Sequence, residues 1–284
     1  MLKKWIKAFR LEEVLLMSGF FVIGGIFAIE SFDYENILKL ILLSIMSFFI
    51  VMSVYAFNAA AGKEQDKNNI RLQNLWDLKR STFQLFSVVF FVISIFTSLY
   101  LKPISAILSL VIIIIWIFYS HPRYGLKQKA VWGTLTHFIG QILHFNLAFL
   151  IFSSISVESV LISMFFAIAF SSGHLLHEII DYDADKRAGL KTSAISFGCK
   201  KTLAVLIGLL IINLLLLNIL SIFDYINKVA FLCFLPASFF HLILLVHYYY
   251  SKKNSPIIIR NAYRVLYFIS GVSLLVFLIF DYLK

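Results

Sequence analysis

Long apolar runs separated by short polar segments organise the whole chain. Each run is about as long as a helix needs to cross the hydrocarbon core of a bilayer, roughly 20 residues. Proline marks both limits of one run, because Pro103 can begin a helix and Pro122 ends it. The pattern predicts nine membrane-spanning helices, at residues 13–30, 38–57, 82–101, 103–120, 132–152, 156–176, 202–223, 229–249 and 263–282. We therefore expect an all-α, polytopic membrane protein whose residues 1–284 form a single transmembrane domain.

The composition supports the same class of protein. The chain is 61% hydrophobic and 17% aromatic, which is more apolar than a soluble domain of 284 residues would be. In such a chain the formal net charge of +10 reflects charge at a membrane surface, and we expect no nucleic-acid partner. Cys199 lies near a loop and Cys233 lies inside an apolar run, so neither indicates a disulfide framework or a metal site.

The basic residues gather on one side of the predicted membrane. Of the 25 lysines and arginines, 21 precede the first helix or follow helices two, four, six and eight. The exceptions are Lys39, Lys102, Lys228 and Lys284. Because cytoplasmic loops carry the excess of positive charge, we expect a multi-pass protein of the cell membrane with a cytoplasmic N-terminus and a C-terminus on the opposite side.

A cluster of four carboxylates follows the sixth predicted helix, in a chain that is only 14% charged. If this stretch continues as a helix, Glu178, Asp181 and Asp185 share one face, whereas Asp183 points elsewhere. Carboxylates at the end of a membrane segment usually hold a divalent cation or occupy a functional cavity. Magnesium fits this pattern, because it takes one or two carboxylates together with waters and substrate phosphates.

A thinner polar stripe follows the second predicted helix. Asn58, Gly62 and Asp66 recur at a spacing of four residues, which places them on one face of a helix. Both polar segments lie on the same predicted membrane face. Two such helix ends suggest a diphosphate held between them by Mg²⁺, with lysines and arginines of the same loops, Lys191 among them, neutralising the phosphates.

These motifs resemble those of the UbiA superfamily of intramembrane prenyltransferases, and the resemblance spans nearly the whole chain. Asn58 and Asp66 match the ends of the family's first motif, Asn-Asp-x-x-Asp-x-x-x-Asp, but Ala59 and Gly62 replace its two intermediate aspartates. The second motif, Asp-x-x-Asp-x-x-x-Asp followed by Gly and Thr, is matched by Glu178, Asp181, Asp185, Gly189 and Thr192. A third marker, Tyr-Ser/Thr-x-x-Pro-x-x-Leu-Lys, is similar to the stretch from Tyr119 to Lys127.

The resemblance implies nine transmembrane helices and a magnesium-dependent reaction. The donor of the isoprenyl group would be an isoprenyl diphosphate, and the acceptor would be a hydrophobic or aromatic molecule such as a quinone precursor. The protein would work within the lipid bilayer. It implies catalytic roles for Asp181 and Asp185, and magnesium ligation by Asp66, Glu178, Asp181 and Asp185. The expected substrate-binding residues are Asn58, Tyr119, Lys127, Lys191 and Arg71, the last as the basic residue nearest to the first motif. The excess of positive charge that cytoplasmic loops ordinarily carry would also explain the basic members of this set.

Several alternatives remain open from the sequence. Because two aspartates of the first motif are missing, the second interpretation is a non-catalytic or divergent relative. Such a protein would bind isoprenoid lipid or cyclise a terpene. His137, Gln141 and His144 share one helix face and would bind the acceptor or form hydrogen bonds between helices. His174, His177 and Glu178 have the spacing of a zinc or iron site, but no matching motif accompanies them. A transporter is disfavoured, because no paired glycine or proline breaks interrupt the helices at mid-membrane.

Overall fold

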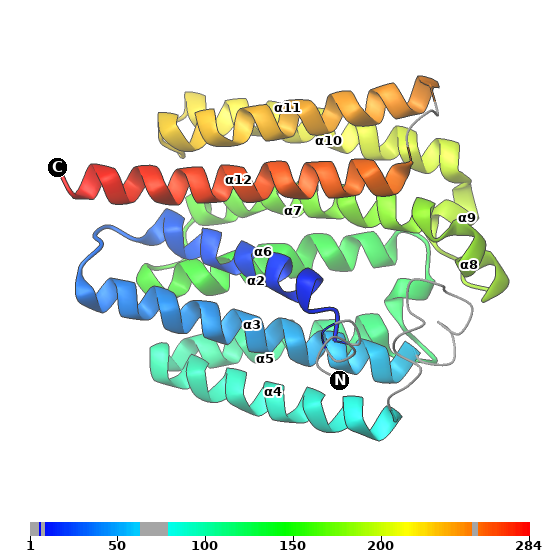
Figure 1. The fold of residues 1–284 in the computed structure, drawn as a ribbon, viewed down its shortest axis with the longest axis horizontal. Helices are drawn as coiled ribbons and strands as arrows, with labels where there is room; N and C mark the ends of the chain where they lie inside the picture. The colour runs from blue at the N-terminus through cyan, green and yellow to red at the C-terminus, as the bar shows by residue number, and fades with distance from the viewer. Residues whose placement is uncertain (1–5, 7–8, 63–78, 252–254) are drawn as a thin grey trace.

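The computed structural model describes residue 6 and residues 9–62, 79–251 and 255–284. In this part of the chain, nine long helices are apolar enough to cross a membrane, and they lie side by side in one bundle (Figure 1). They are α2 (Leu11–Ala28), α3 (Tyr34–Gly62), α4 (Arg80–Leu101), α5 (Pro103–Ser120), α6 (Trp132–Phe152), α7 (Val157–Ile180), α10 (Cys199–Ile222), α11 (Lys228–Ser251) and α12 (Pro256–Tyr282). Three short helices connect them, η3 (Leu126–Gln128), α8 (Tyr182–Arg187) and α9 (Ser193–Phe197).

The all-α, nine-helix prediction is confirmed over the described residues, and the differences lie at the helix ends. Helix α7 continues to Ile180 rather than to 176, and α12 begins at Pro256 rather than at 263. Helix α3 reaches Gly62, so Asn58 lies within a helix and not in a loop. Hydropathy detects only the apolar part of each helix, whereas these extensions carry polar side chains.

Local sequence explains where several helices begin. Ser156 and Ser159 form a reciprocal capping box at the start of α7, with hydroxyl oxygens 3.1 and 3.0 Å from each other's backbone nitrogens. The carboxylate of Asp33 accepts the Asn36 backbone N–H at 2.9 Å at the start of α3. Pro103 and Pro256 occupy the first positions of α5 and α12, where a missing N–H costs nothing.

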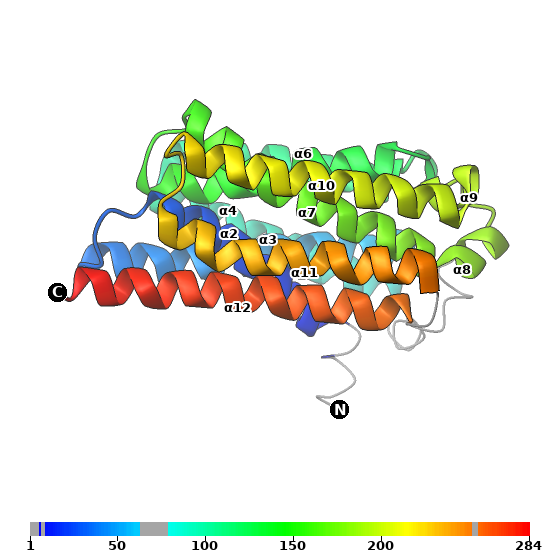
Figure 2. The same ribbon diagram turned by 90° about the horizontal axis from the view of Figure 1, so that it is seen from above.

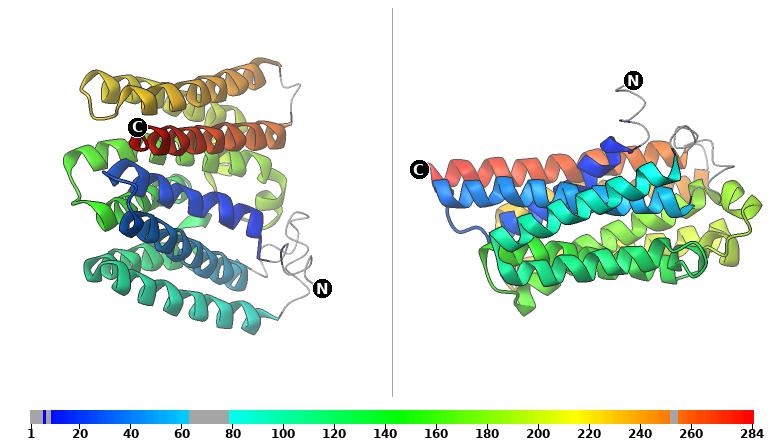
Figure 3. Two further views of the ribbon diagram at one scale, coloured as in Figure 1. Left: turned by 60° about the vertical axis from the view of Figure 1, so that its left-hand side comes forward. Right: turned by 90° about the horizontal axis from the view of Figure 1, so that it is seen from below.

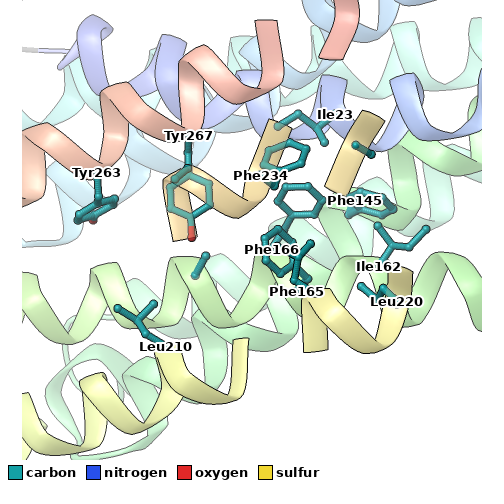
Figure 4. Packing of buried hydrophobic residues seen from close by; sticks show 14 of the residues in the cluster. Ile23, Phe145, Ile162, Phe165, Phe166, Leu210, Leu220, Phe234, Tyr263 and Tyr267 are labelled. Atoms are coloured by element: carbon teal, nitrogen blue, oxygen red, sulfur yellow. The ribbon is translucent and has the colours of Figure 1, made fainter. Parts of the chain in front are cut away.

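The core divides into two hydrophobic clusters. One joins α2, α6, α7, α10, α11 and α12, and the phenyl rings of Phe145, Phe165, Phe166 and Phe234 pack together at its centre (Figure 4). The other joins α2, α3, α4, α5 and α6. Small residues allow close approach within this second half, where the Ser53 and Ser87 hydroxyls each donate to the other's backbone oxygen at 2.9 Å.

One end of the bundle carries α8, α9 and η3, and the C-terminus lies at the other end (Figures 1, 2 and 3). Two connections from distant parts of the chain meet at the first end. The backbone N–H of Lys191 donates to the Gln128 oxygen at 3.1 Å, and a parallel bridge pairs Lys129 with Lys191. The backbone N–H of Val131 donates to the Ser193 hydroxyl at 3.1 Å, although Val131 has a φ of 68° that β-branched residues rarely adopt. We call residues 128–131 and 191–193 the loop bridge.

Candidate functional site

A cavity of about 460 Å³ opens inside the bundle, lined by residues of α2, α3, α5, α6, α7 and α12 and of the short segments beside them. Its lining changes character along its length. The end near α8 is charged, one side wall is polar and aromatic, and the deeper part is apolar. A single space of this kind suits a molecule with a charged head and a long hydrocarbon tail.

The acidic wall of the cavity comes from the end of α7 and the start of α8. The helix breaks at Asp181, where φ is −91° and ψ is 5°. Two hydrogen bonds nevertheless continue the turn, from Asp181 N to the His177 oxygen and from Asp185 N to the Asp181 oxygen, both at 2.9 Å. As a result Glu178, Asp181 and Asp185 all line the cavity, whereas Asp183 is exposed and does not.

Glu178 is the most buried of these carboxylates, with only 4% of its surface exposed. Its Oε2 atom accepts the backbone N–H of Ala194, in the first turn of α9, at 3.1 Å. Its Oε1 atom lies 3.2 Å from His174 Nε2 and has no aligned hydrogen-bond donor among the described residues. The absent side chain of Gly133 makes room for this pair, because a methyl group there would lie 3.0 Å from His174 Nε2. A buried carboxylate oxygen without a donor is a fitting position for a cation.

The opposite wall comes from α3, α5 and η3. Lys127 donates from Nζ to the side-chain oxygen of Asn58 at 3.1 Å, so these two distant residues meet at the charged end of the cavity. The Tyr119 hydroxyl also lines the cavity and lies 3.3 Å from His137 Nε2. Ala59 and Gly62 give this wall no carboxylate.

Three of the expected site residues are not placed in the cavity. Asp66 and Arg71 fall outside the described residues, so their predicted roles stay predictions. The side chain of Lys191 is exposed and does not line the cavity, whereas its neighbours Leu190 and Thr192 do. Lys191 instead takes part in the loop bridge through its backbone.

The structure adds two cavity residues that sequence reasoning had assigned to topology alone. Arg10 precedes α2 in a left-handed conformation, with φ of 52°, and pairs with Glu13 at 3.2 Å over the ring of Tyr55. Burial on its own lowers the pKa of Arg10, but Tyr55, Glu13 and Asp181 raise it, so the net pKa lies above its ordinary value and the side chain stays charged. Arg264 of α12 places its guanidinium NH2 atom 3.0 Å from His177 Nε2.

The polar side wall comes from the helix face that the spacing of His137, Gln141 and His144 predicted. All three side chains line the cavity, and two of them also contact neighbouring helices. Trp116 donates from Nε1 to His144 Nε2 at 3.1 Å, and the ring of His137 stacks on that of His174 at 4.2 Å. An interhelical hydrogen bond is therefore present at His144, and acceptor binding by this face stays a prediction.

The deeper part of the cavity is hydrocarbon. Ile23 and Ile26 of α2 line this part of the cavity together with Val272 and Leu275 of α12. Gly271 of α12 also lines it. Phe170 lines the cavity beside Phe20, with ring centroids 3.7 Å apart. Its neighbours in the sequence, Phe165 and Phe166, pack instead in the core and are almost fully buried.

The donor set fits magnesium better than zinc. Within the described residues, no three His, Cys, Asp or Glu side chains converge closely enough to hold a metal ion by themselves. His177 contacts Arg264 and His174 contacts Glu178, so the histidines do not form a shared site. Magnesium needs no such enclosure, because it keeps several waters and is bound through one or two carboxylates plus phosphate oxygens. Glu178, Asp181 and Asp185 offer oxygen ligands of this kind.

Comparison with known proteins bears on the fold and on the family. None of the curated protein sequences matches this chain. Among solved structures, a UbiA homologue from Archaeoglobus fulgidus bound to GPP and Mg²⁺ has a TM-score of 0.77 at 17% identity, with 96% of this chain and 98% of that chain covered. The same homologue bound to DMAPP and Mg²⁺ has a TM-score of 0.73 at 17% identity, covering 96% and 98%. An apo UbiA homologue from Aeropyrum pernix K1 has a TM-score of 0.73 at 16% identity, covering 94% and 98%.

At these identities the solved structures establish the fold. The family itself follows from the sequence profile of the UbiA prenyltransferase family, which matches residues 18–279. With nine membrane-spanning helices in its described part and a profile match over most of its length, this chain is a multi-pass membrane protein that belongs to the UbiA prenyltransferase family.

Proposed function

We propose that this protein is a magnesium-dependent prenyltransferase that moves an isoprenyl group from an isoprenyl diphosphate to an aromatic or quinone-precursor acceptor. One observation supports it most strongly: a single cavity joins three carboxylates at one end to a hydrocarbon wall at the other. An isoprenyl diphosphate has the same division into a charged head and an apolar tail. The A. fulgidus homologue bound to GPP or DMAPP with Mg²⁺ supports this choice of donor and metal.

The diphosphate head would lie between the two walls at the charged end. Glu178, Asp181 and Asp185 would hold Mg²⁺, with Asp181 and Asp185 as the catalytic pair. Bound there, Mg²⁺ supplies positive charge to the leaving diphosphate. Lys127, held by Asn58 at 3.1 Å, would face the phosphates from the other wall beside Tyr119. Asp66 as a metal ligand and Arg71 as a substrate-binding residue complete the proposal, whereas the exposed side chain of Lys191 is left out of it.

The tail would lie along the hydrocarbon wall of α2 and α12. In the transfer, the bond between the first prenyl carbon and the diphosphate oxygen breaks, and both electrons leave with the diphosphate. An acceptor carbon then forms the new bond and loses a proton. Ile23, Ile26 and Leu275 line the deeper part of the cavity, and such hydrocarbon side chains would disfavour water beside the allylic cation before the acceptor reacts.

The acceptor would occupy the polar side wall. Trp116 and Tyr119 offer aromatic surfaces there, and Gln141 offers an amide for hydrogen bonding. His137 lies beside the Tyr119 hydroxyl and is placed to receive the proton that the acceptor loses. A flat acceptor with polar substituents fits this combination better than a second hydrocarbon chain does.

A divergent relative that binds isoprenoid lipid or cyclises a terpene is the second candidate. The observation that favours it is the wall of α3, where Ala59 and Gly62 stand in place of the aspartates of the family's first motif. We further propose that the end of the bundle carrying α8 and α9 faces the cytoplasm, because most basic residues lie in the connections at that end. The N-terminus would then be cytoplasmic and the C-terminus on the opposite side.

The test is turnover by the purified protein in lipid nanodiscs. Radiolabelled geranyl or geranylgeranyl diphosphate is incubated with a panel of phenolic and quinone-precursor acceptors, and prenylated product and released diphosphate are measured. We expect acceptor-dependent product that disappears with EDTA and returns with Mg²⁺. Diphosphate release without any acceptor, accompanied by a cyclic hydrocarbon, would favour the terpene-cyclising alternative. If the protein neither binds nor turns over any isoprenyl diphosphate, the proposal is overturned.

A further inference from the structure

Arg264 occupies an unusual position for an arginine in an apolar helix. It lies two turns inside α12 (Pro256–Tyr282) and lines the cavity. Charged side chains within membrane helices are costly and usually face a functional cavity. Helix α12 contributes no residue to either aspartate-rich motif, so nothing in the motifs accounts for this charge.

The partner of Arg264 is a neutral group. A guanidinium can only donate hydrogen bonds, so His177 Nε2, at 3.0 Å, must be the acceptor and its ring must carry its proton on Nδ1. A hydrogen bond from a cation to a neutral acceptor is weaker than one to an anion. The Nε–H group of Arg264 is buried and has no hydrogen-bond partner among the described residues. The guanidinium therefore has donor capacity left over at this site.

The contact lies beside the acidic wall. His177 directly precedes Glu178 and lies one helical turn before Asp181, and all of them line the cavity together with Arg264. If Asp181 holds the Mg²⁺ that binds an isoprenyl diphosphate, the diphosphate group would lie close to the guanidinium of Arg264. Phosphate oxygens match the planar fork of arginine, which favours exchange of the imidazole for the phosphate.

We propose that Arg264 binds the donor diphosphate directly, leaving His177 when the donor enters the cavity. The inference rests on the proposed function, because it takes an isoprenyl diphosphate as the ligand. Ala59 and Gly62 of α3 have no carboxylate that could hold a metal against the diphosphate. Arg264 of α12 would supply part of the positive charge that such a metal would bring. Arg264 would be a positioning residue at the diphosphate, and His177 would hold its guanidinium before the donor binds.

Arg260 provides a matched control. It lies one turn before Arg264 on the same helix and carries the same side chain, but it does not line the cavity. Its guanidinium contacts the side-chain oxygen of Asn261 at 3.1 and 3.2 Å near the surface. Arg260→Gln therefore removes the same charge from the same helix at a position that does not line the cavity.

The experiment measures binding in nanodiscs of geranyl S-thiolodiphosphate, an unreactive analogue of the donor, in the presence of Mg²⁺. Geranyl monophosphate serves as the second probe. A lost charge-assisted contact predicts that Arg264→Gln weakens diphosphate binding at least about tenfold and reduces the preference over the monophosphate. Arg264→Lys keeps a point charge but not the fork, so we expect a smaller loss of about threefold. Arg260→Gln should bind like the wild type.

The outcomes separate this inference from the proposed function. If the wild type binds neither probe, the proposed function fails and the role of Arg264 fails with it. If the wild type binds and Arg264→Gln binds equally well, or if Arg260→Gln weakens binding as much, only the role of Arg264 is overturned. Should Arg264→Gln not fold, as judged by thermal unfolding, Arg264→Lys decides the matter: wild-type affinity and wild-type preference for the diphosphate would overturn the inference.

Discussion

The two walls at the charged end of the cavity differ in the chemistry that they offer. The wall formed by α7 and α8 carries Glu178, Asp181 and Asp185. The wall formed by α3 and η3 carries Asn58 and Lys127, which contact each other, and Ala59 and Gly62 add no charge to it. In a symmetric site, each wall would hold a metal through its own carboxylates. Here the described residues place three carboxylates on one wall and a cation on the other.

The difference indicates how a diphosphate would be divided between the walls. One side would reach the phosphates through Mg²⁺, and the other through lysine directly. Direct contact with a cation and contact through a metal both neutralise phosphate, but they respond differently to substitution and to chelation. The variants below separate the two walls, starting with the change that we expect to have the largest effect.

Neutralising the acidic wall should have the largest effect. Asp181→Asn and Asp185→Asn each keep the size of the side chain but remove the charge of a carboxylate that we propose as a magnesium ligand. Loss of one such electrostatic group typically lowers turnover by about 10²–10³-fold, and we expect a decrease of this order in diphosphate release. Asp183→Asn is the control, because Asp183 is exposed and lies outside the cavity. Equal losses in all three variants would mean that the wall acts through general surface charge.

Neutralising the opposite wall should have a smaller effect. Lys127→Met keeps the length of the side chain but removes the ammonium group that contacts Asn58. A charge-assisted hydrogen bond contributes about 1.5–3 kcal/mol, so kcat/KM for the donor should fall by about tenfold or more, mostly through a higher KM. Lys191→Met should change kcat/KM little, because its side chain is exposed and does not line the cavity. The reverse order of effects would place the cationic contact on Lys191.

Glu178 allows its structural and chemical roles to be separated. Glu178→Gln keeps an oxygen that accepts the Ala194 N–H but removes the charge, so activity should fall while thermal stability changes little. Glu178→Leu leaves that buried N–H without an acceptor, which costs about 1–3 kcal/mol of folding free energy. Thermal unfolding in detergent, measured beside turnover, checks both. If Glu178→Gln is fully active, Asp181 and Asp185 are sufficient as metal ligands.

The far end of the bundle should respond least. The Ser31 hydroxyl and the Asn36 N–H donate to Asp33 and lower the pKa of its carboxyl group. A lowered pKa stabilises the fold above the pKa of the unfolded chain, about 3.9, and this contribution is lost as the pH falls through the folded value. Asp33→Ala should therefore lower the unfolding temperature slightly at pH 7, with unchanged turnover. Asp33→Asn should retain the helix cap and lose only the pH dependence. A turnover defect in either variant would link the two ends of the bundle.

Much of the fold was predictable from hydropathy, because a long apolar run has only one common solution in a bilayer, the helix. The helix ends were not predictable in the same way. Arg260, Asn261 and Arg264 dilute the apolar character at the start of α12, so its first turns do not register in a hydropathy pattern. One of these three polar residues, Arg264, lines the cavity.

The candidate site was predictable where spacing alone fixes direction. The intervals between Glu178, Asp181 and Asp185 predicted a shared face, and hydrogen bonds across the break at Asp181 keep the three side chains on one cavity. Arg10 and Arg264 could not be recognised, because a basic residue that faces a cavity and one that faces lipid headgroups look alike in the sequence. The meeting of Asn58 with Lys127 depends on the packing of η3 against α5 and α6, which no local pattern encodes.

The loop bridge has a consequence for the order in which the protein matures. Chains emerge from the ribosome N-terminus first, so the strained Val131 is synthesised well before its partner Ser193. Until Ser193 emerges, the Val131 N–H lacks the acceptor that offsets its unfavourable conformation. A nascent chain that stops before the end of α7 contains one cationic wall and no acidic wall. The two walls of the charged end are therefore completed at different times in biogenesis, and the acidic wall comes last.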